Sequence, residues 1–426
     1  MPTNQIFQQS EVVRKQLFPA WMELKYNVLT DFIAKGEVEQ VGERDFRIPA
    51  KKIFGGRAGH YDPQGGDMGR GSSPQGVVML QSFFSARLNF EFDQLQIKAT
   101  TNKKVAVQNP FLQCVADGYR EFMLYWDKWI HGNGTAKLAT ATNHSSSSGV
   151  SVYTLDANFG AQLLRRGQFL CVYDSTLTTL KSANSLGITD MVTSPPTRTI
   201  TLSGVVPGAA NTDVMCFEGV SGASPIGPRG LKYWISSAAS GTTAGINRAT
   251  ESEIISKSVT ASGYLIPELP MAIYHRILMD RGEVANSMLG LAAPAQQGYV
   301  ASNVMAIQNY NLADASAKFV DRLPGVKGKK VFEWGDVPHW LDIHQDQTVV
   351  PYIVPSLFGR AQLSPTDFFQ TPGVSGPSGR FFTLYGGSGA PASAVWFSLE
   401  KNEDLYCIDP GAQGLIESLS VPSLYS

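Results

Sequence analysis

The most informative stretch of this sequence is GGRAGHYDPQGGDMGRGSSPQG, residues 55–76. It contains eight glycines in 22 residues and almost no large apolar side chains. Fixing the backbone of a residue costs roughly 1–2 kcal/mol, and glycine loses more freedom than any other residue. The stretch has too little apolar surface to offset that cost. We therefore expect a segment that is either mobile or ordered by another polypeptide chain.

Strand-like segments flank the glycine-rich stretch. Phe46 and Ile48 lie two residues apart before it, and apolar and polar residues alternate through residues 88–93 after it. A period of two is typical of a half-buried strand, so we predict one long hairpin within residues 37–103. Its predicted tip consists of the glycines Gly55, Gly56, Gly59, Gly65, Gly66, Gly69 and Gly71.

The clearest helix of the sequence is predicted at residues 110–131. Asn109 is a suitable N-cap, Pro110 suits the first turn, and Gly132 and Gly134 favour a left-handed turn at the end. Apolar residues recur at spacings of three and four, so one face should pack on a broad surface such as a sheet. The residues predicted to make that contact are Leu112, Val115, Tyr119, Phe122 and Trp126.

The rest of the chain favours many short strands and few helices. A second helix is predicted from Pro270 to Gly282, and the low-complexity residues 141–151 are predicted to form a loop. Together these segments indicate an α+β fold. Strands are expected at residues 169–173, 199–202, 214–217, 231–235, 329–334, 349–354, 381–385, 394–399 and 405–408.

The composition excludes several classes of protein. The 426 residues are 43% hydrophobic and carry a net charge of -1, so no global field exists to hold nucleic acid tightly.

The start of the sequence lacks a secretory signal pattern and no stretch is apolar enough to span a membrane, so we expect a cytosolic origin. The four cysteines are scattered, which favours buried thiols over disulfides or a zinc cluster.

No group of residues predicts catalysis. The segment HWLDIHQDQ holds His339, Asp342, His344 and Asp346, but its spacing suits no metal site, and we expect a structural role on the surface or in a partly buried position. Gly66, Gly69 and Gly71 lack the strand, the helix and the G-K-[ST] of a phosphate loop. No G-x-S-x-G occurs either. We therefore predict a non-enzymatic protein without catalytic residues, cofactor or metal.

The order of these parts resembles the major capsid protein family of tailed bacteriophages, which encapsulin-type shells share. The resemblance implies an N-terminal arm at residues 1–36 and an extended hairpin loop with flanking strands at residues 37–103. It implies a peripheral domain at residues 104–160 whose spine helix is residues 110–131. It also implies a mixed, β-rich axial domain at residues 161–426, interleaved with peripheral-domain strands.

A second stretch strengthens the resemblance. Asp213 lies at a predicted strand, a Gly-Leu step follows at Gly230 and Leu231, and the segment Gly245-Ile246-Asn247-Arg248 comes after a Ser/Thr/Gly run. The resemblance covers nearly the whole chain.

The resemblance also implies a function. The chain would self-assemble into the hexamers and pentamers of an icosahedral shell that encloses double-stranded DNA, held only weakly and non-specifically. Portal, scaffold or decoration proteins would be partners, no membrane would be involved, and assembly in the host cytoplasm would place the chain in the virion capsid. The alternatives are an encapsulin-type nanocompartment and a β-rich virion fibre or adhesin protein.

Overall fold

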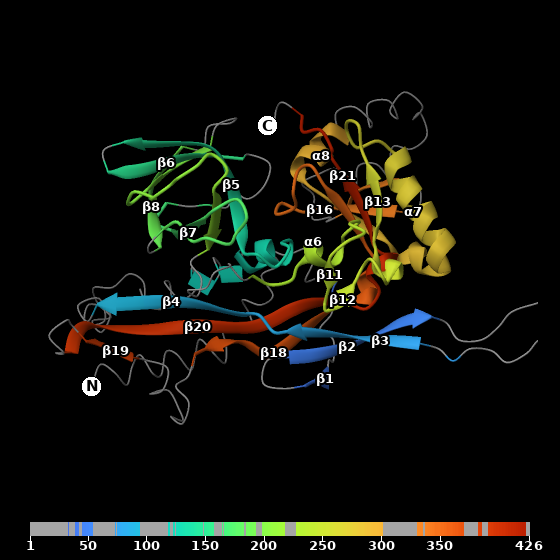
Figure 1. The fold of residues 1–426 in the computed structure, drawn as a ribbon, viewed down its shortest axis with the longest axis horizontal. Coiled ribbons are helices and arrows are strands. Elements are labelled where there is room, and N and C mark those ends of the chain that lie inside the picture. The colour runs from blue at the N-terminus through green and yellow to red at the C-terminus, as the bar shows by residue number, and fades with distance from the viewer. Residues whose placement is uncertain are drawn as a thin grey trace, which may run out of the picture. The chain divides into compact units, whose positions relative to one another are not determined.

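The chain forms a mixed, sheet-rich fold divided into two compact units (Figure 1). The first unit contains residues 1–31, 83–128 and 362–404, and the second contains residues 32–82, 129–361 and 405–426. At this coarse level the structure confirms the predicted α+β class. The computed structural model describes residues 33, 39–41, 45–53, 73, 75–93, 118–119, 122–123, 125–147, 149–156, 164, 166–182, 185–192, 198–217, 227–300, 330–334, 337–369, 382–385 and 391–422.

The first unit is built on a four-stranded sheet around a long strand, β20 (Pro391–Cys407). Strand β4 (Ser85–Asp93) runs antiparallel beside it, as Figure 1 shows in blue and red. Strands β18 (Phe358–Phe368) and β19 (Phe382–Tyr385) complete the sheet. The predicted pairing of residues 88–93 with residues 46–48 is wrong. The alternating pattern identifies a strand but not its partner, which here comes from near the far end of the chain.

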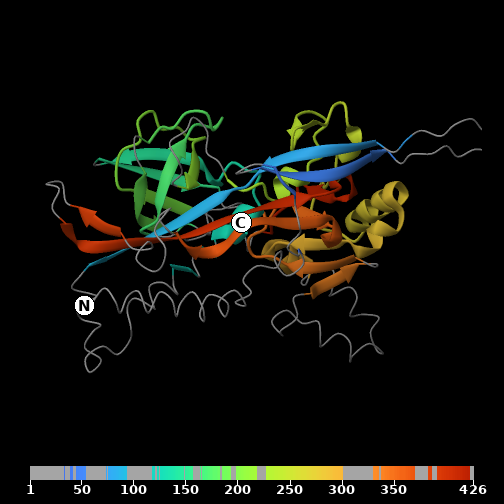
Figure 2. The same cartoon turned by 90° about the horizontal axis from the view of Figure 1, so that it is seen from below.

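A smaller sheet in the second unit contains the strands beside the glycine-rich stretch. Its order is β1 (Glu39–Gln40), β2 (Asp45–Ile53) and β3 (Gln75–Ser82). Strands β2 and β3 form an antiparallel hairpin with Asp45 opposite Ser82 and Ile53 opposite Gln75. Figures 1 and 2 show the two blue strands running side by side.

The second unit also contains a closed β-barrel, coloured green in Figure 1. Residues 141–151, predicted as a loop, instead lie mostly in strands of this barrel. Serine and threonine tolerate a strand whose outer face meets water, so low complexity alone does not indicate a loop. In barrel order the strands are β10 (Val214–Phe217), β5 (Lys137–Ser147), β6 (Val150–Leu155), β9 (Arg198–Leu202), β8 (Leu186–Val192) and β7 (Phe169–Tyr173).

A mixed six-stranded sheet carries one of the hydrophobic cores of the second unit. Helix α7 (Glu268–Arg281) packs on it through buried Ile273 and Ile277, and Gly414 in the sheet leaves room for them. The short helix α8 (Pro294–Tyr299) follows β14 directly. In sheet order the strands are β13 (Lys257–Thr260), β21 (Gly414–Glu417), β17 (Val350–Ile353), β14 (Leu289–Ala292), β16 (Val337–Leu341) and β15 (Lys330–Trp334).

One predicted strand is a helix. Residues 231–235 form helix α6 (Leu231–Trp234), in which Leu231 and Trp234 are buried. Two buried residues three positions apart fit one face of a helix, whereas a strand would place them on opposite faces. The remaining short elements are β11 (Thr242–Thr243), β12 (Ile246–Asn247), η3 (Ser252–Ile254), η4 (Gly282–Ser287), η7 (Pro355–Leu357) and η9 (Pro410–Ala412).

Among the described residues, no helix combines the length and apolarity needed to cross a bilayer.

Candidate assembly surfaces

The hairpin of β2 and β3 has one buried face and one exposed face. Phe46 and Ile48 of β2 and Met79 and Gln81 of β3 are at most 1% exposed. Val78 and Leu80, which point to the other side, are 58% and 51% exposed. The hairpin therefore presents apolar side chains on both faces, and only one face is covered by its own unit.

Specific hydrogen bonds fix the buried face of the hairpin. The Gln81 Nε2 donates to the carbonyl of Leu405 at 3.1 Å, and the same carbonyl accepts from the Trp234 Nε1 at 2.9 Å. The ring of Phe46 meets that of Tyr406 edge-on, with centroids 6.3 Å apart. A buried glutamine with a defined acceptor sets the register of the strand, because a slip of one residue would leave its amide without that partner.

The Gly-Ile-Asn-Arg segment identified in the sequence lies beside this hairpin. The amide of Leu80 donates to the carbonyl of Ala244 at 3.3 Å, and the amide of Ala244 donates to the Tyr233 hydroxyl at 2.7 Å. Ala244 and Gly245 both have positive φ, which closes the turn between β11 and β12. The turn thus supports the base of the hairpin.

The predicted glycine tip lies outside the described residues, as do Leu112 and Val115 of the predicted spine helix. Helical residues occur at 118–119, 122–123 and 125–130, and the amide of Gly132 donates to the carbonyl of Trp129 at 2.9 Å just beyond them. Tyr119, Phe122 and Trp126 are buried, at 2%, 2% and 0% exposure.

Trp126 packs within the first unit on a buried charged group. The Lys401 Nζ lies 4.4 Å from the centroid of its ring, and Glu403 lies 3.6 Å from the same nitrogen. The ring of Phe84 is 6.0 Å away. A cation held against an indole face in a water-poor site is stabilised by the ring quadrupole. Sequence periodicity indicates the buried face of the helix but gives no signal for this lysine on a distant strand.

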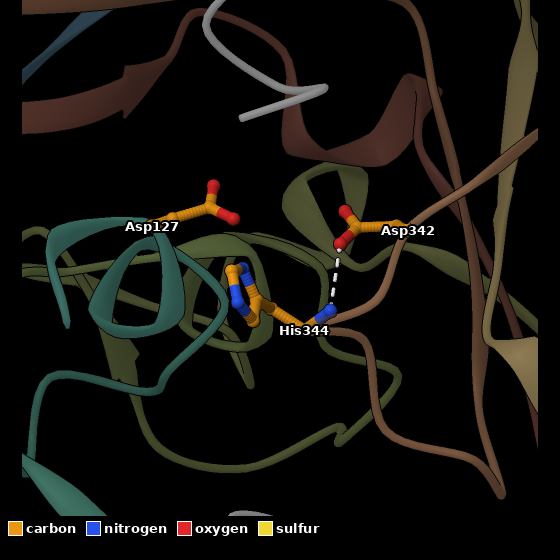
Figure 3. A group of neighbouring side chains, drawn as sticks. All are labelled: Asp127, Asp342 and His344. Atoms are coloured by element: carbon orange, nitrogen blue, oxygen red, sulfur yellow. Dashed lines mark hydrogen bonds between the residues drawn. The ribbon is translucent and has the colours of Figure 1, made fainter. Parts of the chain in front are cut away.

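At the end of the helix, His131 makes a buried contact with a carboxylate of the second unit. The His131 Nε2 lies 2.6 Å from the Asp342 Oδ2. The amide of His344 donates to the Asp342 Oδ1 at 3.0 Å, as Figure 3 shows. Burial alone raises the pKa of Asp342, but the His131 ring and the hydrogen bonds hold it below its usual value.

His339 is also buried and has a structural environment. Its Nε2 lies 2.9 Å from the Tyr352 hydroxyl and its Nδ1 3.1 Å from the carbonyl of Val337. Burial lowers the pKa of His339 to about 3, against the upward effect of the Val337 carbonyl. The segment HWLDIHQDQ is more deeply buried than the expected surface or partly buried position, because His339, Asp342 and His344 are at most 2% exposed.

Comparison with known structures gives the class of the fold. The capsid asymmetric unit of cyanophage A-1(L) aligns over 92% of this chain and 91% of that chain, with a TM-score of 0.50 and 11% identity. The capsid of a native GTA particle aligns over 91% and 89%, with a TM-score of 0.43 and 9% identity. The mature capsid of bacteriophage PhiM1 aligns over 93% and 88%, with a TM-score of 0.42 and 8% identity.

Sequence comparison finds no matching family model and no matching curated protein. At identities near one in ten, similarity to solved structures defines the fold and nothing finer. The chain therefore has a phage-capsid fold, and the resemblance to the tailed-phage capsid family is confirmed at that level.

Proposed function

We propose that this chain is a major capsid protein whose copies assemble as hexamers and pentamers into an icosahedral shell around double-stranded DNA. The observation that carries the proposal is the alignment with the cyanophage capsid subunit over nine-tenths of both chains. A match of that extent leaves little of the chain for another function. The role is structural, without catalysis.

The outward face of the hairpin supports the proposal at the level of residues. Val78 and Leu80 lie on one face of β3, opposite Pro49 and Arg47 of β2, and all four are exposed. Burying a valine or leucine side chain fully is worth about 1.5–3 kcal/mol. A second copy of this chain is the occupant we propose, since the capsid fold functions as an array of identical subunits. Many such modest contacts acting together would hold a lattice firmly.

The near-neutral net charge of the chain suits a capsid that must later release its DNA. A net charge of -1 gives no strong counterion release, so contact with packaged DNA would be weak and non-specific. We propose portal, scaffold or decoration proteins as further partners, assembly in the host cytoplasm and a final location in the virion capsid.

An exposed-face variant tests the proposal. Val78→Asp combined with Leu80→Asp should leave the thermal unfolding of the subunit unchanged, because both side chains face solvent in the subunit. It should abolish closed particles in sedimentation and electron microscopy. Val192→Asp is the matched control, since this valine is 48% exposed on barrel strand β8, away from the hairpin.

Three outcomes would contradict the proposal. A normal particle yield from the double variant would show that the hairpin face makes no assembly contact. Particles that enclose a second protein instead of nuclease-protected DNA would indicate an encapsulin-type shell, and elongated trimers would indicate a fibre protein.

A further inference from the structure

Two cysteines face each other across neighbouring strands of the β-barrel. Strands β7 and β10 are antiparallel, and Cys171 is the direct register partner of Cys216. Both are thiols in the structure. Directly opposed residues of an antiparallel pair have Cα atoms about 4.5 or 5.5 Å apart, depending on the hydrogen-bonding pattern. Both values fall within the roughly 4.4–6.8 Å that a disulfide bridges.

The two thiols also share one face of the sheet. Leu170, Val172 and Met215 belong to the barrel core, whereas Cys171 and Cys216 belong to a separate apolar cluster with Tyr173 and Val214. Strand residues alternate between the two faces, so the cysteines point away from the barrel interior. Cys171 is 6% exposed and Cys216 is 0% exposed.

Residues 174–181 after β7, called the covering loop below, pack against the apolar cluster that contains the cysteine pair. Leu177 and Leu180 pack against the cysteine cluster. Leu177 has a φ of 60°, a left-handed conformation that is unfavourable for a non-glycine residue and persists only when its surroundings enforce it. The loop is held at one end by Asp174, whose side chain accepts from the amides of Thr178 and Thr179 at 2.9 and 3.1 Å.

The other end of the covering loop is held by an ion pair. The Lys181 Nζ donates to the Asp213 Oδ1 at 2.5 Å and to the carbonyl of Gly208 at 2.8 Å. Asp213 is 0% exposed, accepts from the Tyr153 hydroxyl at 3.2 Å, and lies directly before β10. The loop is therefore fixed at both ends and strained at Leu177, in its middle.

We propose that Cys171 and Cys216 form a cross-strand redox site that closes to a disulfide when a small-molecule disulfide reaches it. Cys171, the more exposed sulfur, attacks the oxidant as its thiolate and expels one thiol. Cys216 then loses its proton, attacks the sulfur of Cys171 and expels the second thiol. One protein disulfide forms, one oxidant disulfide is reduced, and the two protons leave with the two expelled thiols.

The structure also sets the speed of this reaction. Burial and the neighbouring Cys171 raise the pKa of Cys216 to about 12, against the lowering effect of Lys137 on the adjacent strand. Because the thiolate is the reactive form, oxidation should be slow until the covering loop opens. Leu177 is the residue whose removal should speed it.

The timing of the reaction rests on the proposed function, whereas the site does not. A capsid subunit assembles in a reducing cytoplasm and meets oxidising conditions only after release, so the disulfide would form in the finished particle. It would then link the neighbouring barrel strands β7 and β10 covalently.

Oxidation of the purified full chain with oxidised glutathione under native conditions tests the site. We expect the intact mass to fall by two hydrogen atoms and peptide mapping to join Cys171 to Cys216. Cys216→Ser should stop at a glutathione adduct on Cys171, and Cys407→Ser should behave as wild type. Leu177→Gly should accelerate the link at least several-fold, and Val205→Gly, in an exposed barrel loop, should not.

The site is refuted if the wild-type chain gains no link after prolonged native oxidation, or if either cysteine joins a different partner. Equal oxidation rates for Leu177→Gly and wild type would refute the covering role of the loop. Particle formation is scored separately on the reduced protein, so failure of the capsid proposal and failure of the redox site give different results.

Discussion

Replacing Trp126 by alanine should strongly destabilise the first unit. The side chain is 0% exposed, and its ring contacts Lys401, itself only 3% exposed, at 4.4 Å. Truncating a buried tryptophan costs about 3–5 kcal/mol through lost transfer energy and the cavity that remains. The loss of a desolvated cation–π contact, worth about 2 kcal/mol in such sites, places Trp126→Ala toward the upper end.

Urea unfolding followed by circular dichroism measures this effect. A loss of about 4 kcal/mol lowers the unfolding midpoint by about 1.3–4 M urea at slopes of about 1–3 kcal/mol per M. Trp126→Phe should lose less, because a ring still covers Lys401. Met279→Ala is the control for an exposed apolar residue, being 78% exposed, and should change stability by less than about 0.5 kcal/mol. If Trp126→Ala unfolds within about 0.5 kcal/mol of wild type, the packing described for Trp126 is wrong.

Two further predictions concern the second unit. Gly230→Ala would place a Cβ onto the carbonyl of Ile130 and should cost about 1–3 kcal/mol in thermal unfolding, whereas Gly263→Ala, with open space around it, should be nearly neutral. His339 is neutral when folded, with a pKa of about 3 against an ordinary 6.5, so the unfolded chain takes up its proton first as the pH falls. Protonation of His339 in the unfolded chain should therefore lower the free energy of unfolding by about 2 kcal/mol between pH 7 and pH 5. The variant His339→Gln should show a smaller dependence of stability on pH in this range. An unchanged slope would contradict the buried neutral histidine.

Local patterns in the sequence predicted the positions of strands better than they predicted which strands pair with each other. The alternation at residues 88–93 identified a strand correctly, yet β4 pairs with β20 instead of closing the hairpin. Strand β3 carries the run Val77-Val78-Met79-Leu80, whose apolar residues favour a strand and could have indicated the true partner of β2. Pairing depends on tertiary contacts that a period of two does not encode.

The buried polar residues were the least predictable part of the candidate surfaces. His131 and Asp342 lie far apart in sequence and meet at 2.6 Å only in the fold. Lys401, which contacts the ring of Trp126, is likewise hard to predict, because lysine side chains usually lie on the surface. By contrast, the stripe of Tyr119, Phe122 and Trp126 follows from helical spacing alone, and all three side chains are buried.

Electron microscopy of the purified wild-type chain, after concentration under reducing conditions, is the most direct test of the proposed capsid assembly. We expect closed shells of uniform diameter, with density for residues 55–76 lying on a neighbouring subunit. A chain that remains monomeric at every concentration, or one whose residues 55–76 pack on their own subunit, would contradict it.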